Sequence, residues 1–336
     1  MQMKRLLFIG PDSHEITGSS QFMRELLCSK YLTTCLSINL VKGNENVHLE
    51  GYFGERYDVL VCWQVMLPAS VLRRIDYSRG VFFPMYDGCP SVYKIDRWLP
   101  YREFQIVSFC RKLHEDLLRV GLSSHYIQYY PKPIELADWG DEARIFFWRR
   151  RQAVGVSLIE TLFSSIEIQA LHLHDALDSG MTAELPVLKN GWTLTVSTWY
   201  EQKLEMINDM QMAAYYVAPR EREGIGMSFL EAMAAGRCVV GVDEPTMNEY
   251  IIHGHNGLLY SPGQPVAFEQ FDLRELQKQA REDSLRGRRG WEDKQAQIFE
   301  WINEVPRMNL VRIFARLLIR FLSSPITVSK SIFRMF

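Results

Sequence analysis

The sequence predicts an α/β protein with two doubly wound domains, each built on a parallel sheet. Short apolar runs alternate with helical patterns in the first half of the chain, and the same alternation restarts after an interruption between Pro131 and Arg144. Such alternation is typical of parallel sheets covered by helices. A chain of 336 residues also has room for two domains of about 150 residues each.

The composition is that of a globular cytoplasmic protein. Hydrophobic residues make up 47% of the chain and charged residues 23%, with a formal net charge of -2, so neither disorder nor a nucleic-acid partner is indicated. The six cysteines form no Cys-x-x-Cys pair, which argues against a disulfide framework or a zinc site. The first apolar run, residues 6–9, is too short for a signal peptide and suits a buried strand.

The first domain, residues 1–135, is expected to contain five strands and two main helices. The strands are expected over residues 5–10, 57–63, 80–87 and 104–109, with a fifth from residue 125 that the prolines at 131 and 133 end. The helices are expected over residues 21–32 and 111–121. Ser108 is the expected N-cap of the second helix, and Gly121 its expected stop.

The second domain, residues 136–290, is expected to repeat this architecture. Its strands are expected over residues 144–148, 166–174, 192–198, 214–219, 238–243 and 257–262. One helix is expected over residues 199–213. In the second strand, His172 and His174 share one side, but no third metal ligand is evident, so strand packing is the favoured interpretation.

The stretch "PREREGIGMSFLEAMAAG", residues 219–236, carries the functional signal. It forms a loop at the carboxyl end of a buried strand and then a helix, which is where ligands bind in open α/β sheets. Gly224 and Gly226 permit a close approach of the backbone, and the free N–H groups of the helix's first turn suit a diphosphate. Glu223 and Glu231 bracket that site, and carboxylates accept hydrogen bonds from sugar hydroxyls. These features together fit a nucleotide sugar.

This stretch resembles the donor-binding motif of retaining GT-B glycosyltransferases of family 4, the glycosyl transferases group 1. There, two glutamates with seven residues between them lie in a "Glu-Gly-x-Gly... Glu-Ala-x-Ala-x-Gly" context, which "EGIGMSFLEAMAAG" matches. The next segment, "CVVGVDEPTMNEYIIHGHNGLL", also resembles the family, with Glu249, Gly254 and Gly257 in place. The resemblance implies a GT-B fold of two Rossmann-like domains facing a central cleft.

The resemblance also implies roles for individual residues. Glu223 would contact the donor sugar, Glu231 the ribose and Arg149 the diphosphate. The implied donor-binding set comprises Arg149, Arg151, Gly224, Ile225, Gly226, Met227, Glu231 and Gly18. Two departures stand out: Val154 occupies the family's lysine position, and "EPTMNE" replaces a Gly-Gly pair. Either Arg150 or Arg151 substitutes for the lysine, or the donor diphosphate is bound more weakly than in the family.

Two features of the first domain are expected to face the cleft. Asp87 follows a strand and is a candidate to orient or deprotonate an acceptor hydroxyl; the alternative is a turn role beside Gly88. The loop after the first strand contains Gly18 and would lie near the diphosphate and acceptor, unless it is a plain connection.

The implied activity is transfer of a sugar, with retention, from a nucleotide-sugar donor to a hydroxyl of a saccharide or glycolipid acceptor. A metal-independent hexosyltransferase of bacterial surface-polysaccharide or lipopolysaccharide synthesis is the expected type, with no cofactor. One alternative is a sugar phosphorylase or nucleotide-sugar epimerase, which the paired glutamates disfavour. Another is a non-catalytic GT-B homologue that serves as a membrane-associated assembly subunit, which the two departures favour.

The C-terminal segment is a separate electrostatic unit. Residues 305–336 contain six basic residues and no acidic ones, and Arg312, Arg316 and Arg320 recur at a spacing of four. The apolar stretch is shorter than the roughly 20 residues needed to cross a bilayer. An amphipathic helix on the anionic inner face of the cytoplasmic membrane is therefore predicted. The alternative is that the tail packs on the protein core. A helix over residues 291–304 is expected to return to the first domain instead, which leaves the tail free.

Overall fold

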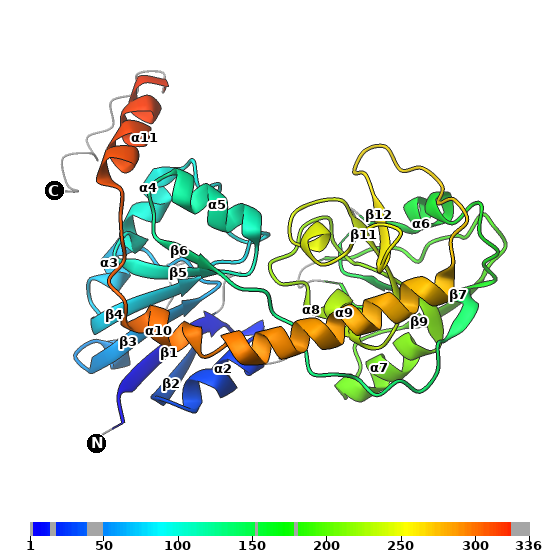
Figure 1. The fold of residues 1–336 in the computed structure, drawn as a ribbon, viewed down its shortest axis with the longest axis horizontal. Coiled ribbons are helices and arrows are strands. Elements are labelled where there is room, and N and C mark those ends of the chain that lie inside the picture. The colour runs from blue at the N-terminus through cyan, green and yellow to red at the C-terminus, as the bar shows by residue number, and fades with distance from the viewer. Residues whose placement is uncertain (1–2, 14–17, 39–49, 152–153, 178–180, 324–336) are drawn as a thin grey trace.

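The computed structural model describes residues 3–13, 18–38, 50–151, 154–177 and 181–323, and it shows two lobes (Figure 1). The N-terminal lobe is built on a parallel sheet of order β2-β1-β3-β4-β5-β6. Its strands are β1 (Arg5–Pro11), β2 (Leu32–Ile38), β3 (Arg56–Trp63), β4 (Asp76–Phe83), β5 (Phe104–Ser108) and β6 (Ser124–Tyr126). Most of these strands are buried on both faces, as parallel sheets are.

The C-terminal lobe is built on a second parallel sheet, of order β12-β11-β10-β7-β8-β9. Its strands are β7 (Asp141–Arg149), β8 (Ala170–Asp175), β9 (Thr193–Ser197), β10 (Ala213–Val217), β11 (Cys238–Val242) and β12 (Gly257–Tyr260). All six lie where the sequence predicts strands. The two doubly wound sheets confirm the predicted α/β class.

Helices cover the sheets and connect the strands. They are α2 (Gln21–Cys28), α3 (Ala69–Leu72), α4 (Ile95–Trp98), α5 (Arg111–Arg119), α6 (Val156–Leu162), α7 (Lys203–Gln211), α8 (Met227–Ala234), α9 (Leu273–Lys294), α10 (Gln297–Asn303) and α11 (Leu310–Ser323), with short 3-10 turns η2 (Glu50–Tyr52), η3 (Leu99–Tyr101) and η4 (Met247–Glu249).

Three local predictions are corrected by the structure. Helix α2 ends at Cys28 rather than Leu32, because residues 32–38 form the edge strand β2. The N-cap of α5 is Cys110, and Ser108 instead closes a turn by accepting a hydrogen bond from the Cys110 N–H at 3.1 Å. Helix α7 begins at Lys203, four residues after its predicted start.

The chain crosses back to the N-terminal lobe after the second sheet. Helix α9 extends from the C-terminal lobe toward the N-terminal lobe, where α10 follows (Figure 1). At the end of α9, Trp291 packs edge-on against Tyr129, with 5.2 Å between ring centroids. In α10, Trp301 stacks on His125 at 4.5 Å, and Phe299 lies near Tyr31. Residues 291–304 thus contact the first sheet and its neighbours.

Helix α11 also packs on the N-terminal lobe, contrary to the expectation of a free tail. Ile313 is only 3% exposed and belongs to the core of that lobe. The Asn309 N–H donates to the Gly121 carbonyl at 2.9 Å, so the segment joins the end of α5. Gly121 has a φ of +93°, and a Cβ there would lie 2.6 Å from the Asn309 oxygen. A side chain at residue 121 would therefore displace the start of α11.

Candidate functional site

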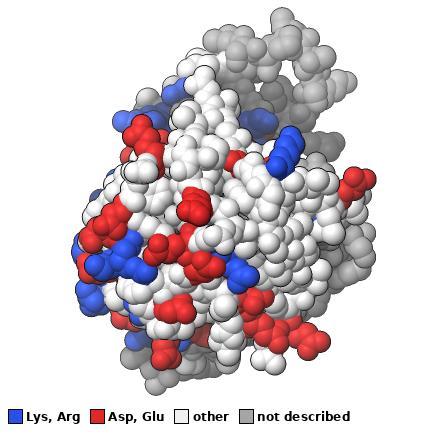
Figure 2. Space-filling view, turned by 90° about the vertical axis from the view of Figure 1, so that its right-hand side faces the viewer, with Lys and Arg blue, Asp and Glu red and all other residues white. Residues whose placement is uncertain are grey.

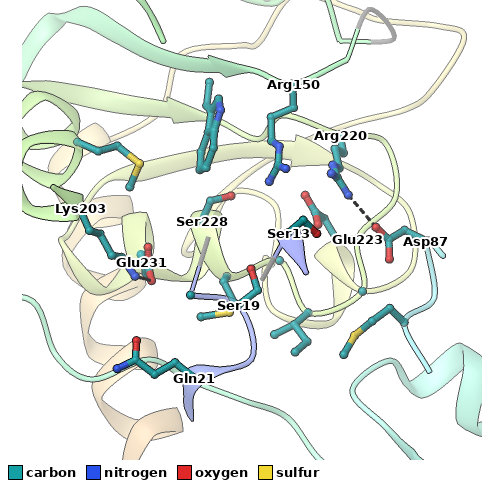
Figure 3. Close-up of a pocket in the computed structure, with 18 of the residues that line it drawn as sticks. Ser13, Ser19, Gln21, Asp87, Arg150, Lys203, Arg220, Glu223, Ser228 and Glu231 are labelled. Carbon is teal, nitrogen blue, oxygen red and sulfur yellow. Dashed lines mark hydrogen bonds and ion pairs between the residues drawn. The ribbon is translucent and has the colours of Figure 1, made fainter. Parts of the chain in front are cut away.

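The two sheets bring their topological switch points together. In the N-terminal sheet, chain order reverses between β1 and β3; in the C-terminal sheet it reverses between β7 and β10. Ligands of open α/β sheets bind beyond the carboxyl ends of strands at such points. A cavity of about 460 Å³ lies there, lined by Ser13 and Gln64 of the N-terminal lobe and by residues of the β10–α8 loop. Both lobes therefore contribute to one site (Figure 3).

The β10–α8 loop places the motif residues on the cavity wall. Glu223, Gly224, Ile225, Gly226, Met227 and Glu231 all line it. Gly226 is the residue before α8 and has a φ of +78°; a Cβ there would lie 1.8 Å from the Phe229 ring. Only glycine fits this turn, and Met227 and Ser228, the first residues of α8, line the cavity.

Gly224 lies against the N-terminal lobe. A Cβ on Gly224 would lie 2.7 Å from the Met85 Cβ and 2.9 Å from Asp87 Oδ1, both in the N-terminal lobe. The glycine was predicted to bring the backbone close to a ligand. The structure shows that it also accommodates the opposite lobe.

Glu231, which lies in α8, is buried and forms an ion pair with a residue of another helix. It is 6% exposed, and its carboxylate contacts the ammonium of Lys203 at the start of α7. Burial raises the pKa of the Glu231 carboxyl, and the Lys203 charge opposes that shift. Lys203 also lines the cavity, and sequence reasoning did not single it out. The pair lies on the side of the cavity opposite Arg220 and Asp87 (Figure 3).

Asp87 lies at the cavity and bridges the lobes. Its Oδ2 accepts a hydrogen bond from Arg220 Nη1 at 2.9 Å, with both side chains largely buried. Its other oxygen, Oδ1, is buried and has no hydrogen-bond partner among the described residues. Arg220 comes from the β10–α8 loop, three residues before Glu223. This ion pair was not foreseen, because its partners are 133 residues apart.

The predicted phosphate-binding arginine, Arg149, does not line the cavity. Its guanidinium forms a two-point ion pair with Asp175, at 2.8 and 2.6 Å, and donates to the Glu184 carbonyl at 2.8 Å. Successive residues of a strand point to opposite sides, so Arg150, the next residue, is the one that reaches the cavity. Arg151 is exposed and is not among the cavity's lining residues. Val154, at the family's lysine position, is fully buried in the core.

An aromatic cluster lines the C-terminal side of the cavity. It consists of Trp148, His174, Trp199 and Tyr200. His174 stacks on Tyr200 with 4.7 Å between centroids, and its Nδ1 lies 3.1 Å from Ser197 Oγ. Burial lowers the pKa of His174 to about 4, so the ring is neutral near pH 7. The described residues contain no group of three histidine, cysteine or acidic side chains arranged to hold a metal ion.

The loop that replaces the family's Gly-Gly pair supports the motif loop. Thr246 has a φ of +77°, which is rare for a β-branched residue, and its Oγ1 donates to the Glu223 carbonyl at 2.7 Å. Glu249 lies outside the cavity and contacts α5 of the N-terminal lobe. This loop therefore fixes Glu223 and joins the lobes.

Gly18 lines the cavity with a φ of +66°, while residues 14–17 of its loop lie outside the described part of the chain. The residues predicted to bind a membrane lie elsewhere, on α11. Arg312 Nη1 donates to the Leu118 carbonyl at 3.3 Å, and the Arg316 guanidinium lies 5.4 Å from the Tyr93 ring centroid. The side chain of Arg320 lies outside the described residues. In the portion that the structure covers, every helix is too short or too polar to traverse a bilayer.

Comparisons with known proteins agree with this architecture. Residues 181–275 match the family model for glycosyl transferases group 1. No curated protein sequence matches the chain. Among solved structures, a sucrose-phosphate synthase from Thermosynechococcus elongatus has a TM-score of 0.59 at 13% identity, with 95% of this chain and 99% of that chain covered.

Two further structures are similar. A glycosyltransferase from Rickettsia africae has a TM-score of 0.58 at 13% identity, covering 90% of this chain and 100% of that one. The lipopolysaccharide outer core galactosyltransferase WaaB has a TM-score of 0.50 at 15% identity, covering 95% and 99%. At these identities the likeness establishes the fold. The chain has the GT-B fold, and residues 181–275 of its C-terminal lobe match the group 1 glycosyl transferases.

Proposed function

We propose that this protein is a retaining GT-B glycosyltransferase that moves a hexose from a nucleotide-sugar donor to a hydroxyl of a saccharide or glycolipid. One observation carries the proposal: the Glu223–Glu231 loop and helix lie at the switch point of the C-terminal sheet and face the N-terminal lobe across one cavity. The match of residues 181–275 to the group 1 glycosyl transferases supports it.

The donor fits the C-terminal wall of this cavity. Glu223 accepts hydrogen bonds from the sugar hydroxyls, and Glu231, beside Lys203, accepts from the ribose. The backbone amides of Ile225, Gly226 and Met227, just before and at the start of α8, face the diphosphate. Arg150 takes the phosphate-binding place that the sequence suggested for Arg149, because Arg150 lines the cavity.

The acceptor fits the N-terminal wall, where Asp87 lies. In the proposed reaction the bond from the sugar C1 to the diphosphate oxygen breaks, and the acceptor oxygen bonds to C1 on the same face. The acceptor proton passes to the departing diphosphate, with Asp87 orienting the hydroxyl. Fixed N–H groups and cations stabilise the charge that develops on the leaving group. No metal or cofactor is part of this proposal.

A membrane-associated acceptor is supported by the exposed face of α11. Ile313 is buried and Leu317 packs on the lobe, whereas Leu310, Val311, Phe314, Leu318 and Ile319 are between 54% and 79% exposed. An apolar arc flanked by arginines suits the interface of an anionic membrane. We therefore place the enzyme on the cytoplasmic face of the membrane, in synthesis of a bacterial surface polysaccharide or lipopolysaccharide.

The surface of the C-terminal lobe differs from this arc. Figure 2, which views the molecule from the C-terminal side, shows acidic and basic side chains interspersed on the described part of the surface rather than a continuous basic patch. The membrane proposal accordingly rests on α11, at the far side of the N-terminal lobe (Figure 1).

A non-catalytic GT-B homologue, acting as a membrane-associated assembly subunit, is the second candidate. Two observations favour it. Val154, at the position of the family's lysine, is buried, and the guanidinium of Arg149 is ion-paired with Asp175. In this case the cavity would bind no donor.

Calorimetric titration with UDP, GDP and ADP, and with their common sugar conjugates, separates the two candidates. Binding of one nucleotide is expected, with loss in Glu231→Ala. Glu221→Ala is the matched control, because Glu221 belongs to the same loop but is exposed and is not a lining residue. Absence of binding to all of these ligands would favour the non-catalytic homologue, and equal binding by Glu231→Ala would contradict the proposed donor site.

A further inference from the structure

Asp87 and Arg220 form an ion pair where the two lobes meet. It joins the lobes inside the cavity, with 2.9 Å between Arg220 Nη1 and Asp87 Oδ2 and side-chain exposures of 15% and 10%. Both residues line the cavity. Loss of water around a charged pair is costly, so a pair in this position calls for a reason beyond stability.

The parallel pairing of β10 and β7 brings Arg220 and Arg150 to the same edge of the C-terminal sheet. Strand β10 pairs with β7 in parallel, with Val217 opposite Phe147, and the two arginines each follow three residues later. They therefore flank the crevice at the switch point. Figure 3 shows both side chains extending from the C-terminal lobe into the part of the cavity that holds Glu223.

The charges on the cavity wall favour a second phosphate-binding cation. Its basic lining residues in the described part of the chain are Arg150, Lys203 and Arg220, while the acidic ones are Asp87, Glu201, Glu223 and Glu231. Lys203 pairs with Glu231. A diphosphate carries at least two negative charges and would enter a wall that already has more acidic than basic groups, so it needs more than Arg150 alone.

We propose that Arg220 is an exchangeable cation: it pairs with Asp87 in the empty cavity and transfers to the donor diphosphate when a nucleotide binds. This inference rests on the proposed function and deepens it. The guanidinium has five N–H donors in a planar fork, which matches phosphate oxygens as well as carboxylates. Arg220 would thereby supply the positive charge that Val154 lacks.

The exchange has a consequence for Asp87. Once Arg220 turns to the diphosphate, both carboxylate oxygens of Asp87 are available to an acceptor hydroxyl, including Oδ1, which is buried without a partner among the described residues. The donor would therefore prepare the acceptor side before the acceptor binds. Arg220 is a binding and positioning residue in this scheme, and Asp87 is the group whose availability it sets.

The test compares nucleoside diphosphates with monophosphates by calorimetry on the full chain, using the pairs UDP/UMP, GDP/GMP and ADP/AMP. For the pair that binds, Arg220→Gln is expected to weaken the diphosphate about tenfold to a hundredfold, as loss of a charge-assisted hydrogen bond does, and the monophosphate far less. The diphosphate affinity of Arg220→Lys should fall between those of wild type and Arg220→Gln. Arg222→Gln is the control, because Arg222 is exposed in the same loop and is not a lining residue.

Asp87→Asn provides the readout that a merely structural pair would not give. Exchange predicts that this variant binds the diphosphate several-fold more tightly, because Arg220 no longer has to leave a carboxylate. If Asp87→Asn weakens the diphosphate as much as Arg220→Gln does, the pair only holds the lobes and the inference is overturned. An equal effect of Arg220→Gln on both nucleotides overturns it too.

The two proposals fail in different ways. A wild-type chain that binds none of the six nucleotides contradicts the proposed function. A wild-type chain that binds a diphosphate, with Arg220→Gln unchanged, retains the function and rejects the exchange. Thermal unfolding of each ligand-free variant shows whether the fold is intact before the titrations are compared.

Discussion

Glu249 of the C-terminal lobe caps helix α5 of the N-terminal lobe: both of its carboxylate oxygens lie 2.8 Å from the Arg111 N–H. The Tyr126 hydroxyl donates to the same carboxylate at 2.9 Å, and the Gln128 side chain donates to the Glu249 carbonyl at 3.0 Å. A carboxylate at a helix N-terminus satisfies free N–H groups and meets the positive end of the helix dipole. One residue therefore couples the orientation of the two lobes.

Replacing Glu249 is expected to destabilise the protein. Glu249→Ala should lower the free energy of unfolding by about 1–3 kcal/mol, because it removes the cap and leaves the Tyr126 hydroxyl without its acceptor. Glu249→Gln should cost less, since the amide oxygen still accepts. Urea unfolding measures both, with exposed Glu269→Ala as the control. A Glu249→Ala variant as stable as that control would show that the cap contributes nothing.

Thr246 is expected to hold the Glu223 loop through its hydroxyl. Thr246 is fully buried at a positive φ, and its Oγ1 donates to the Glu223 carbonyl at 2.7 Å. Thr246→Val keeps the shape but leaves that carbonyl without its donor, so a loss of about 1–2 kcal/mol is expected. Thr246→Ser keeps the hydroxyl and is the matched control. Urea unfolding should give a lower free energy of unfolding for Thr246→Val than for Thr246→Ser. Identical curves would show that this hydrogen bond does not stabilise the loop.

The sequence predicts the elements of this fold better than their contacts. All six strands of the C-terminal sheet lie where they were predicted: four contain apolar runs, whereas β8, "ALHLHD", and the edge strand β9, "TLTVS", largely alternate polar and apolar residues. Strand β2 was missed, because it lies at a sheet edge and most of "LTTCLSI" is at least partly exposed, so the apolar run that marks a buried strand is absent.

For the site, too, the sequence predicts local motifs better than contacts between distant residues. The motif from Glu223 to Glu231 lies at the cavity as expected, because one loop and one helix determine its position. Arg150 lines the cavity and Arg149 does not, since family spacing does not fix which side of a strand end faces the cavity. The Asp87–Arg220 pair joins separate lobes, and no local pattern reports how lobes meet. Contacts of this kind depend on tertiary structure.

His174 is expected to make stability fall as the pH drops. Burial lowers its folded-state pKa from 6.5 to about 4, so between these values the unfolded chain binds a proton that the folded chain does not. Stability is then fully present above about pH 6.5 and is lost toward pH 4, by up to about 1.4 kcal/mol per pH unit. Burial lowers the pKa of His172 as well, in the same direction.

Urea unfolding at pH 7.5 and pH 5 tests this dependence. His174→Phe keeps a ring against Tyr200 and removes the titrating group, so the difference between the two pH values should shrink. If His174→Phe and wild type lose the same free energy of unfolding between pH 7.5 and pH 5, His174 is not the source of the pH dependence.

Helix α11 is expected to bind anionic vesicles through its exposed apolar arc. Phe314 and Leu318 are 56% and 59% exposed, and burying each in the interface should stabilise binding by about 1.5–3 kcal/mol. Phe314→Gln with Leu318→Gln should therefore reduce co-sedimentation with phosphatidylglycerol vesicles at least tenfold. Ile313 and Leu317, which pack on the lobe, are left in place so that the helix stays docked.

Val266→Gln is the matched control for vesicle binding, because Val266 is 73% exposed but belongs to the C-terminal lobe. Its binding should equal that of wild type. Added salt should weaken wild-type binding, since the arginines beside the arc attract the anionic lipids and salt screens that attraction. Binding that survives the double substitution, or that Val266→Gln reduces equally, would show that the membrane contact lies elsewhere on the molecule.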